Sequence, residues 1–249
     1  MKLMHILAAS AAIFASAACN AEKAGDAATA KAGPIKPIAA PNNGDWSEMV
    51  SETPEGGFLM GNPNAPVKLV EYGSMTCPHC ADFQEQAEKT LIDKYVKTGQ
   101  VSFEFRNYVR DPFDITATLI ARCGGPSSFF GLTRGLFAEQ KDWIGKIQAA
   151  PQEQQQALMG MPPAQQFNTI AQLAGFQQWA AMRGLPAAKS SACLADEAAT
   201  TKLVQMNSDA TTQYPEFAGT PTFILNGKML ERTANWAALE PQLRAAIGS

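Results

Sequence analysis

The chain has 249 residues and a formal net charge of −3, with 46% hydrophobic and 17% charged residues. This composition is typical of a globular protein that buries a core, and the length allows one large domain or one domain with a sizeable insertion. Basic and acidic residues are interspersed, so the charge pattern gives no indication of nucleic-acid binding.

Residues 1–18 have the features of a secretory signal peptide. Lys2 gives a positive start, residues 6–14 are an apolar run, and residues 15–18 are small. This order predicts export rather than a membrane span, because the run is shorter than the about 20 residues that a bilayer requires. We therefore expect an exported, periplasmic protein in a compartment that permits disulfides.

Cys19 directly follows the small residues and has two interpretations. Residues 16–19 (SAAC) resemble a bacterial lipobox, in which Cys19 would accept a lipid, although Ser16 stands where an aliphatic residue is usual. Alternatively, cleavage after Ala17 leaves a free thiol near the terminus. Residues 19–56 are rich in Ala, Gly and Pro, which predicts a flexible linker, or a tether if Cys19 is lipidated, with order beginning near Gly57.

The segment 57–112 shows a strand–helix–strand pattern. The β-branched and apolar run 67–72 predicts a strand, helical spacing of apolar residues predicts a helix over 81–97, and residues 101–108 predict a second strand. A crossover of this kind normally makes the two strands parallel.

The pattern then becomes helical from 113 to 214, and β structure returns afterwards. Strand-like residues 220–226 lead through an Asn226-Gly227 turn to 228–232, and a final helix is predicted over 234–247. The fold class is therefore α/β: a domain of residues 57–112 and 215–249 with a helical insertion, 113–214. The helices predicted in the insertion are 115–123, 129–140, 163–174, 176–183 and 197–213.

Most large apolar side chains of the insertion are expected in its core, because they recur at helical spacing. The loop 159–163 (MGMPP) is the exception, since it presents soft apolar methionines in a segment without periodicity. The side chains concerned are Phe129, Phe130, Phe137, Trp143, Met159, Met161, Trp179 and Met182.

The cysteine pair Cys77-Pro78-His79-Cys80 lies between the first predicted strand and the start of the helix. Unpaired N–H groups at a helix start stabilise an anion, so Cys77 is expected to be a reactive thiolate. Cys80 lies one turn further on, where it can attack a mixed disulfide formed at Cys77. Pro78 suits the first helical position, and His79 adds a titratable donor that stabilises the reduced form.

Three other interpretations of the pair are less favoured by the sequence. A structural zinc site needs four ligands, and Cys123 and Cys193 show no second C-x-x-C spacing. A cysteine hydrolase needs a histidine from elsewhere, but the only histidines are His5, in the signal, and His79. A purely structural bridge across two residues would close too small a loop to stabilise the fold well. We predict neither a metal site nor a cofactor.

Two segments carry a resemblance to a known family. Residues 62–72 (NPNAPVKLVEY) followed by CPHC at 77–80, together with 219–227 (GTPTFILNG), resemble the DsbA-like branch of the thioredoxin superfamily. The resemblance extends from about Gly57 to the C-terminus and includes the helical insertion. It implies a thioredoxin-like fold and a thiol–disulfide oxidoreductase.

The resemblance also implies roles for individual residues. Cys77 would be the exposed nucleophile and Cys80 the buried resolving thiol, alternating between a dithiol and a redox disulfide. Pro221 would follow a cis peptide bond, a conformation found in about 5–6% of X–Pro bonds. Thr220 would present backbone groups to a bound peptide.

Glu71 interrupts an apolar strand that should lie inside the sheet. A buried carboxylate costs several kcal/mol unless it is paired or protonated, so its presence calls for a reason. DsbA-like proteins carry a Glu at this place, which implies a role in moving the proton of Cys80. The alternative is a structural carboxylate paired with Arg106 on the neighbouring strand.

Cys123 and Cys193 both fall in the insertion. If Cys77 pairs with Cys80, these two are left to form a structural disulfide, as some DsbA-like proteins do; the alternative is two separate buried thiols. Closing a loop of about 70 residues would stabilise the fold by roughly 4 kcal/mol on the chain-entropy model.

The CPHC sequence favours a dithiol oxidase that introduces disulfides into reduced or unfolded exported proteins. A membrane or soluble redox partner would then reset the pair. Thr220 weakens this assignment, because Thr before the cis-proline resembles disulfide isomerases. Isomerase or reductase activity is therefore the alternative, and a redox-inert chaperone or metal-carrying module on the same fold is the second alternative.

Overall fold

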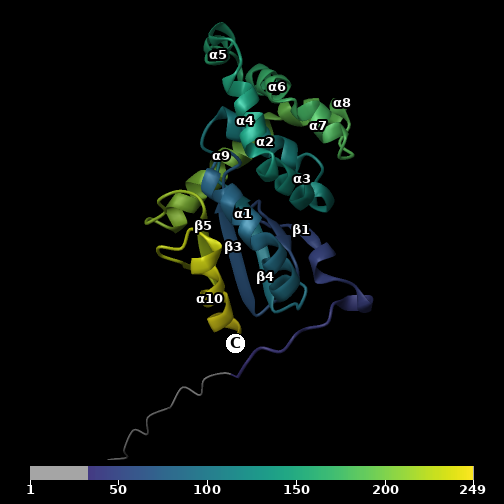
Figure 1. Ribbon diagram of the computed structural model, residues 1–249, viewed down its shortest axis with the longest axis vertical. Coiled ribbons are helices and arrows are strands. Elements are labelled where there is room, and N and C mark those ends of the chain that lie inside the picture. Colours follow the sequence, from purple (N-terminus) through teal and green to yellow (C-terminus); the bar gives the residue numbers. More distant parts are fainter. Residues whose placement is uncertain (1–32, 249) are drawn as a thin grey trace, which may run out of the picture. The chain divides into compact units, whose positions relative to one another are not determined.

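The computed structural model describes residues 33–248. The signal peptide predicted at 1–18 and Cys19 lie outside these residues. The described part is built around one mixed sheet, with helices packed along the sheet and a group of further helices at one of its ends (Figure 1).

The sheet has six strands in the order β1-β2-β4-β3-β5-β6. β3 and β4 are parallel, whereas the other neighbouring pairs are antiparallel, so the predicted crossover is confirmed. The strands are β1 (Val50–Glu52), β2 (Phe58–Met60), β3 (Val67–Gly73), β4 (Val101–Asn107), β5 (Thr222–Leu225) and β6 (Lys228–Met229).

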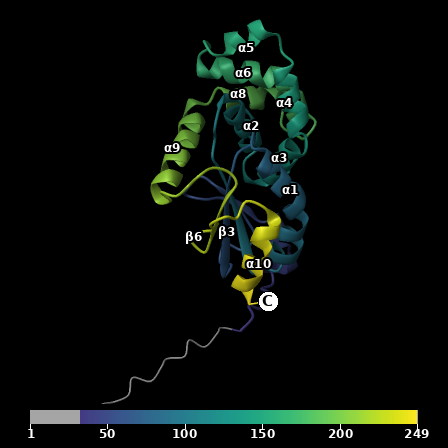
Figure 2. The same cartoon turned by 60° about the vertical axis from the view of Figure 1, so that its left-hand side comes forward.

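Two helices pack on one face of the sheet, α1 (Pro78–Leu91), which continues as a π-helical turn, Ile92–Val96, and α10 (Trp236–Ile247). The ring of Phe83 in α1 lies 4.6 Å from that of Phe223 in β5. The other face, which carries Tyr72, is covered by α9 (Glu197–Gln213), the long helix that Figure 2 shows on the opposite side of the sheet from α10. Alternate residues of β3 therefore face different helices.

The insertion helices that precede α9 form the group at the end of the sheet where α1 begins (Figure 1), and α9 returns along the sheet. The pattern predicted α6 and α9 with their observed bounds, but the helix predicted over 129–140 ends at Ala138, and α4, α5 and α8 were not predicted. The helices are α2 (Pro112–Arg122), α3 (Pro126–Ala138), α4 (Gln140–Gln148), α5 (Gln152–Leu158), α6 (Pro163–Ala174), α7 (Phe176–Ala181), α8 (Ala187–Leu194) and α9 (Glu197–Gln213).

Order begins earlier than the predicted position near Gly57, and that expectation is wrong. Short 3₁₀ helices occur at Pro41–Asn43 and Trp46–Glu48, and β1 pairs with β2 through Val50 and Met60. The indole of Trp46 is buried and donates a hydrogen bond to the carbonyl of Ile38 at 2.8 Å. Elements of three residues are too short to show a periodicity, so the sequence reads as a linker.

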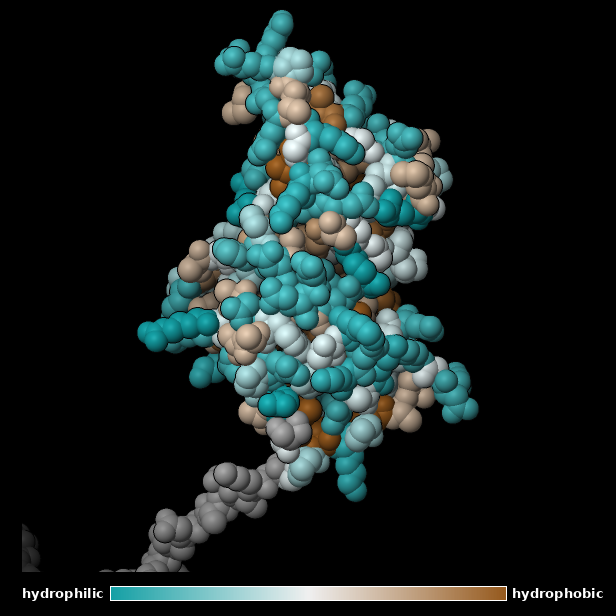
Figure 3. Space-filling view, viewed as in Figure 1, coloured by the Kyte–Doolittle hydropathy of each residue, from teal (hydrophilic) through white to brown (hydrophobic). Residues whose placement is uncertain are grey.

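The surface seen in Figure 3 is mainly hydrophilic, with scattered apolar side chains. Among residues 33–248, no helix has the length and hydrophobicity needed to span a membrane. Met159 is 83% exposed, as the loop pattern predicted. Met182 is 72% exposed and does not belong to the core of the insertion, contrary to expectation, because it follows the last turn of α7.

Candidate active site

The cysteine pair lies at the start of α1, as the sequence predicted. β3 ends at Gly73, and residues 74–77 form the loop that connects it to α1. Cys77 is the last residue of this loop and the N-cap of α1, with Pro78 at the first helical position. The N–H of Cys77 donates to the carbonyl of Ser74 at 3.1 Å, which closes this loop into a turn. Cys77 and Cys80 are both free thiols.

The Cys77 thiol is less accessible than the sequence predicted. Cys80 is fully buried, as predicted, but Cys77 is only 3% exposed, so its description as an exposed nucleophile is wrong for this structure. The segment just before β5 lies against the Cys77 thiol: the Cys77 Sγ is 3.1 Å from the carbonyl oxygen of Thr220. The peptide bond between Thr220 and Pro221 is cis, as the sequence predicted.

The pKa of Cys77 is lowered to about 5. The largest cause is the hydrogen bond with the Cys80 thiol, followed by the side chain of Thr220 and the backbone N–H groups of Cys80 and His79, while desolvation acts in the opposite direction. The Thr220 hydroxyl is buried and has no other partner in the described part of the chain, so it is free to donate to a thiolate. Cys77 is therefore a thiolate at neutral pH.

His79 contributes mainly through its backbone. Its imidazole is largely exposed, and Nδ1 lies 3.8 Å from an oxygen of Asp82. Of the groups of His79, the backbone N–H is the one that lowers the Cys77 pKa, and its effect is smaller than that of the Cys80 thiol. The sequence had assigned that effect to the imidazole, because it could not distinguish the side chain from the amide at a helix start.

The acid–base character of Cys80 and Glu71 is opposite to that of Cys77. Burial is the main cause that raises the pKa of Cys80 well above its usual range, and Glu71 and Cys77 add to the effect electrostatically. The pKa of Glu71 is also raised well above its usual value, first by burial and then by Cys77. Glu71 is fully buried, and neither carboxyl oxygen has a hydrogen-bond partner among the described residues.

The alternative in which Glu71 pairs with Arg106 is wrong. In the parallel pairing of β3 and β4, Glu71 is opposite Phe105, whereas Arg106 is opposite Tyr72, so the two side chains point to different faces of the sheet. Arg106 instead donates two hydrogen bonds to Glu104 at 2.7 and 3.0 Å.

The second pair of cysteines forms a disulfide in the insertion. Cys123, at the end of α2, is bonded to Cys193 in α8, with a Cα–Cα distance of 5.7 Å. The predicted connectivity is therefore confirmed. It leaves Cys77 and Cys80 as the free thiols of residues 33–248.

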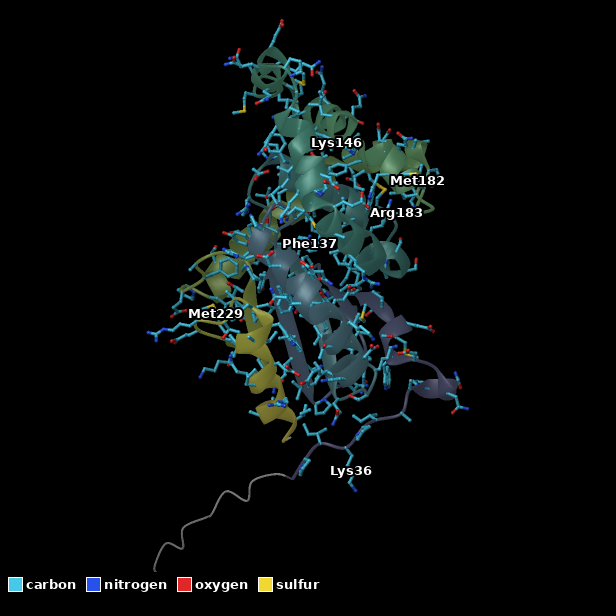
Figure 4. The ribbon with its side chains drawn as sticks, in the orientation of Figure 1. Lys36, Phe137, Lys146, Met182, Arg183 and Met229 are labelled. Atoms are coloured by element: carbon cyan, nitrogen blue, oxygen red, sulfur yellow. A yellow bond between two sulfur atoms is a disulfide. The ribbon has the colours of Figure 1, made fainter. Side chains whose placement is uncertain are left out.

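A cavity of about 320 Å³ opens beside the pair, between α1 and the helices α3 and α4. Pro78 and Gln140 line it together with Phe137, whose position near the start of α1 is labelled in Figure 4. In the part of the chain that the structure describes, no three His, Cys, Asp or Glu side chains gather in a way that could hold a metal ion.

Sequence reasoning missed two residues that contact the loop before Cys77. Asp114 in α2 accepts hydrogen bonds from Ser74 and Met75, and Gln140 in α4 donates to the carbonyls of Met75 and Cys77. Asp114 carried a weak signal, because it is an acid between apolar residues, directly before the helix expected over 115–123. Gln140 carried none.

Comparisons with known proteins place the chain in a family. The thioredoxin family model matches residues 53–245. A crystal structure described as a protein-disulfide isomerase from Novosphingobium aromaticivorans is 37% identical, covers 77% of this chain and 97% of its own, and superposes with a TM-score of 0.73. The α-DsbA1 structure of Wolbachia pipientis has a TM-score of 0.63 at 20% identity, over 82% of this chain and 96% of its own, which shows a shared fold.

A protein of Rickettsia bellii, provisionally named a protein-disulfide oxidoreductase, is 28% identical over 71% of this chain. The match covers 60% of the Rickettsia protein, so the chain spans about three fifths of that relative's length. The family match extends from β2 to α10 and includes the insertion and the cysteine pair. The chain is a member of the thioredoxin family, with an α/β thioredoxin fold that contains a helical insertion.

Proposed function

We propose that this chain is an exported protein thiol–disulfide oxidoreductase that works through Cys77 and Cys80. The observation that carries the proposal is the contrast between the two thiols: Cys77 has its pKa lowered to about 5, and Cys80, one turn away, has its pKa raised. The Cys77 sulfur is thus suited to act as a nucleophile or as a leaving group, and the Cys80 sulfur to stay protonated until it attacks a mixed disulfide.

In the oxidising direction, a substrate thiolate attacks the Cys77 sulfur of the Cys77–Cys80 disulfide. A mixed disulfide forms at Cys77, and Cys80 leaves with the electron pair and takes up a proton. A second substrate thiolate then attacks the substrate sulfur of the mixed disulfide and releases the Cys77 thiolate. The substrate dithiol becomes a disulfide, and the enzyme pair takes up the two electrons.

Glu71 is the proposed proton carrier for Cys80. Its carboxyl group is buried, has no hydrogen-bond partner within residues 33–248 and is electrostatically coupled to both thiols. A group whose pKa is raised this far can take the proton from Cys80 when the pair reacts as a nucleophile and return it when Cys80 leaves.

The segment around the cis-proline is the proposed binding site for substrate peptides. Thr220 and Pro221 lie against Cys77, so a polypeptide joined to the Cys77 sulfur would run past this backbone. The partners would be reduced or unfolded exported proteins, together with a redox partner that resets the pair.

The direction of the reaction has two candidates. The CPHC sequence and the stabilised Cys77 thiolate favour an oxidase, because a stabilised reduced form makes the disulfide more oxidising. Thr220, and the description of the Novosphingobium structure as a protein-disulfide isomerase, favour an isomerase. The export signal and lipidation of Cys19 remain predictions, and mass spectrometry of the mature N-terminus tests both.

The reduction potential of the pair tests the proposal, measured by equilibration with glutathione. An oxidase requires a potential above the about −180 mV of protein disulfide isomerase. It should also oxidise reduced ribonuclease faster than it restores activity to scrambled ribonuclease, and an isomerase should show the reverse. A pair that exchanges with neither substrate would contradict the proposal and favour a redox-inert module.

A further inference from the structure

The loop between β3 and α1 is held by side chains from the insertion. Met75, in the middle of this loop, is fully buried. Its N–H donates to Oδ1 of Asp114 at 2.8 Å, and its carbonyl accepts from Nε2 of Gln140 at 2.8 Å. Both backbone polar groups of one loop residue are therefore satisfied by the insertion rather than by the sheet or by α1.

Gln140 also reaches the nucleophile itself. Its Nε2 donates to the carbonyl oxygen of Cys77 at 2.9 Å, and the same carbonyl accepts the first hydrogen bond of α1, from Ala81. Gln140 is 3% exposed, so water cannot readily replace its amide. Removing the amide would leave two carbonyls with a lost partner at the position where the helix begins.

Asp114 supports the same loop from its other side. The carboxylate is fully buried and accepts from the hydroxyl of Ser74 at 2.5 Å and from the N–H of Arg110 at 3.0 Å. Asp114 and Gln140 come from different helices, α2 and α4, so the loop lies between two elements of the insertion.

We propose that Gln140 is a positioning residue: by binding the carbonyls of Met75 and Cys77, it lets the insertion hold the Cys77 sulfur at the head of α1 within reach of its hydrogen-bond donors. This inference rests on the proposed function, because it assigns the insertion a part in the reactivity of the same pair. Gln140 acts through the backbone and touches neither sulfur in the contacts described.

The physical reason is the short range of the interactions that stabilise the thiolate. These are hydrogen bonds from the Cys80 thiol, the Thr220 side chain and two backbone N–H groups. A small displacement of the loop would lengthen them and weaken the preference for the charged form.

The test is the pH titration of thiolate absorbance at 240 nm in the reduced full chain. Gln140→Leu keeps the approximate size of the side chain and removes the donor. We expect it to raise the Cys77 pKa by about one unit, because a displaced loop weakens the hydrogen bonds that stabilise the thiolate. The reduction potential should fall with it, because a more basic thiolate makes the disulfide less oxidising.

Gln166→Leu is the matched control. Gln166 in α6 donates its amide to the carbonyl of Leu158 at 2.7 Å, so this variant loses the same kind of hydrogen bond inside the insertion, away from the cysteine loop. We expect it to lower the free energy of unfolding without moving the Cys77 titration. If Gln140 had a purely structural role, both variants would lower the free energy of unfolding and leave the Cys77 pKa unchanged.

Gln140→Glu serves as the second variant if Gln140→Leu does not fold. It keeps the length of the side chain but turns an acceptor toward two carbonyls, so the Cys77 pKa should rise at least as far. If the variant that folds has the same Cys77 pKa as the wild-type protein, the inference is overturned. An ordinary thiol pKa in the wild-type protein would instead count against the proposed function, and the two failures are therefore distinguishable.

Discussion

At the scale of single residues, the site contains a buried carboxyl group that lacks the hydrogen-bond partners burial usually demands, as far as the described residues show. Glu71 has no hydrogen-bond partner among the described residues, and a Cβ added to Gly73 would come within 2.4 Å of the Phe105 ring and 3.2 Å of a Glu71 carboxyl oxygen. The strand therefore needs glycine two residues beyond Glu71, where space is limited. Such a poorly satisfied carboxylate is expected at a functional site rather than in a purely structural core.

Glu71→Gln should make the stability of the protein less sensitive to pH. The pKa of Glu71 is raised in the folded state, so the folded state binds more protons than the unfolded chain, and the wild-type protein loses stability as pH rises above about 4.5. The loss should amount to about 1.4 kcal/mol for each unit of pKa elevation. The free energies of unfolding of both proteins should agree near pH 4, and the variant should be the more stable at pH 8.

Urea unfolding of the oxidised proteins measures this difference without titrating the thiols. Asp114, whose pKa is raised to about 7 mainly by burial, contributes a loss of the same sign to both proteins and cancels in the comparison. A difference between the two proteins that stays constant from pH 4 to pH 8 would show that Glu71 does not titrate as described.

At the scale of elements, periodicity predicted those parts of the fold in which a face is buried over several turns or a whole strand. The bounds of α6 were predictable because Pro163 begins the helix and Gly175 ends it with a left-handed conformation. α5, with the sequence QEQQQAL, buries only Leu158, and β1 has three residues. Neither carries a hydrophobic pattern, so only tertiary contacts define them.

Residue chemistry alone indicated the two thiols and the buried carboxylate, and the family resemblance added the cis-proline. The sequence did not predict Gln140, because an amide that binds backbone carbonyls leaves no trace in spacing or composition. It also misjudged the exposure of Cys77, which depends on how closely the segment at Thr220 approaches.

The disulfide between α2 and α8 is expected to act on stability alone. Replacing Cys123 and Cys193 together by Ser should lower the free energy of unfolding by about 2–4 kcal/mol, because the bridge closes a long loop of the unfolded chain. Urea unfolding measures the loss, and the reduction potential of the Cys77–Cys80 pair provides the control. A potential that moves in the double variant would mean that the bridge tunes the active site.

At the scale of the whole described chain, the site lies where three parts of the sequence meet. β3 and α1 supply the cysteine pair, the β5 segment supplies Thr220 and Pro221, and the insertion supplies the contacts to the loop (Figure 1). The two segments of the thioredoxin fold are separated by the insertion in sequence, yet β3 and β5 are neighbours in the sheet. This topology brings Cys77 and the cis-proline together.

In the reduced protein, Cys77 is expected to be a thiolate at neutral pH while Cys80 stays protonated. Titration of the reduced protein at 240 nm tests this most directly. The absorbance should rise with a midpoint near pH 5 and correspond to one thiolate, and Cys77→Ser should abolish that step. Above it, the Cys80 thiol should titrate only at strongly alkaline pH, because burial raises its pKa. A first midpoint near the ordinary cysteine value of about 8.5 would contradict the account.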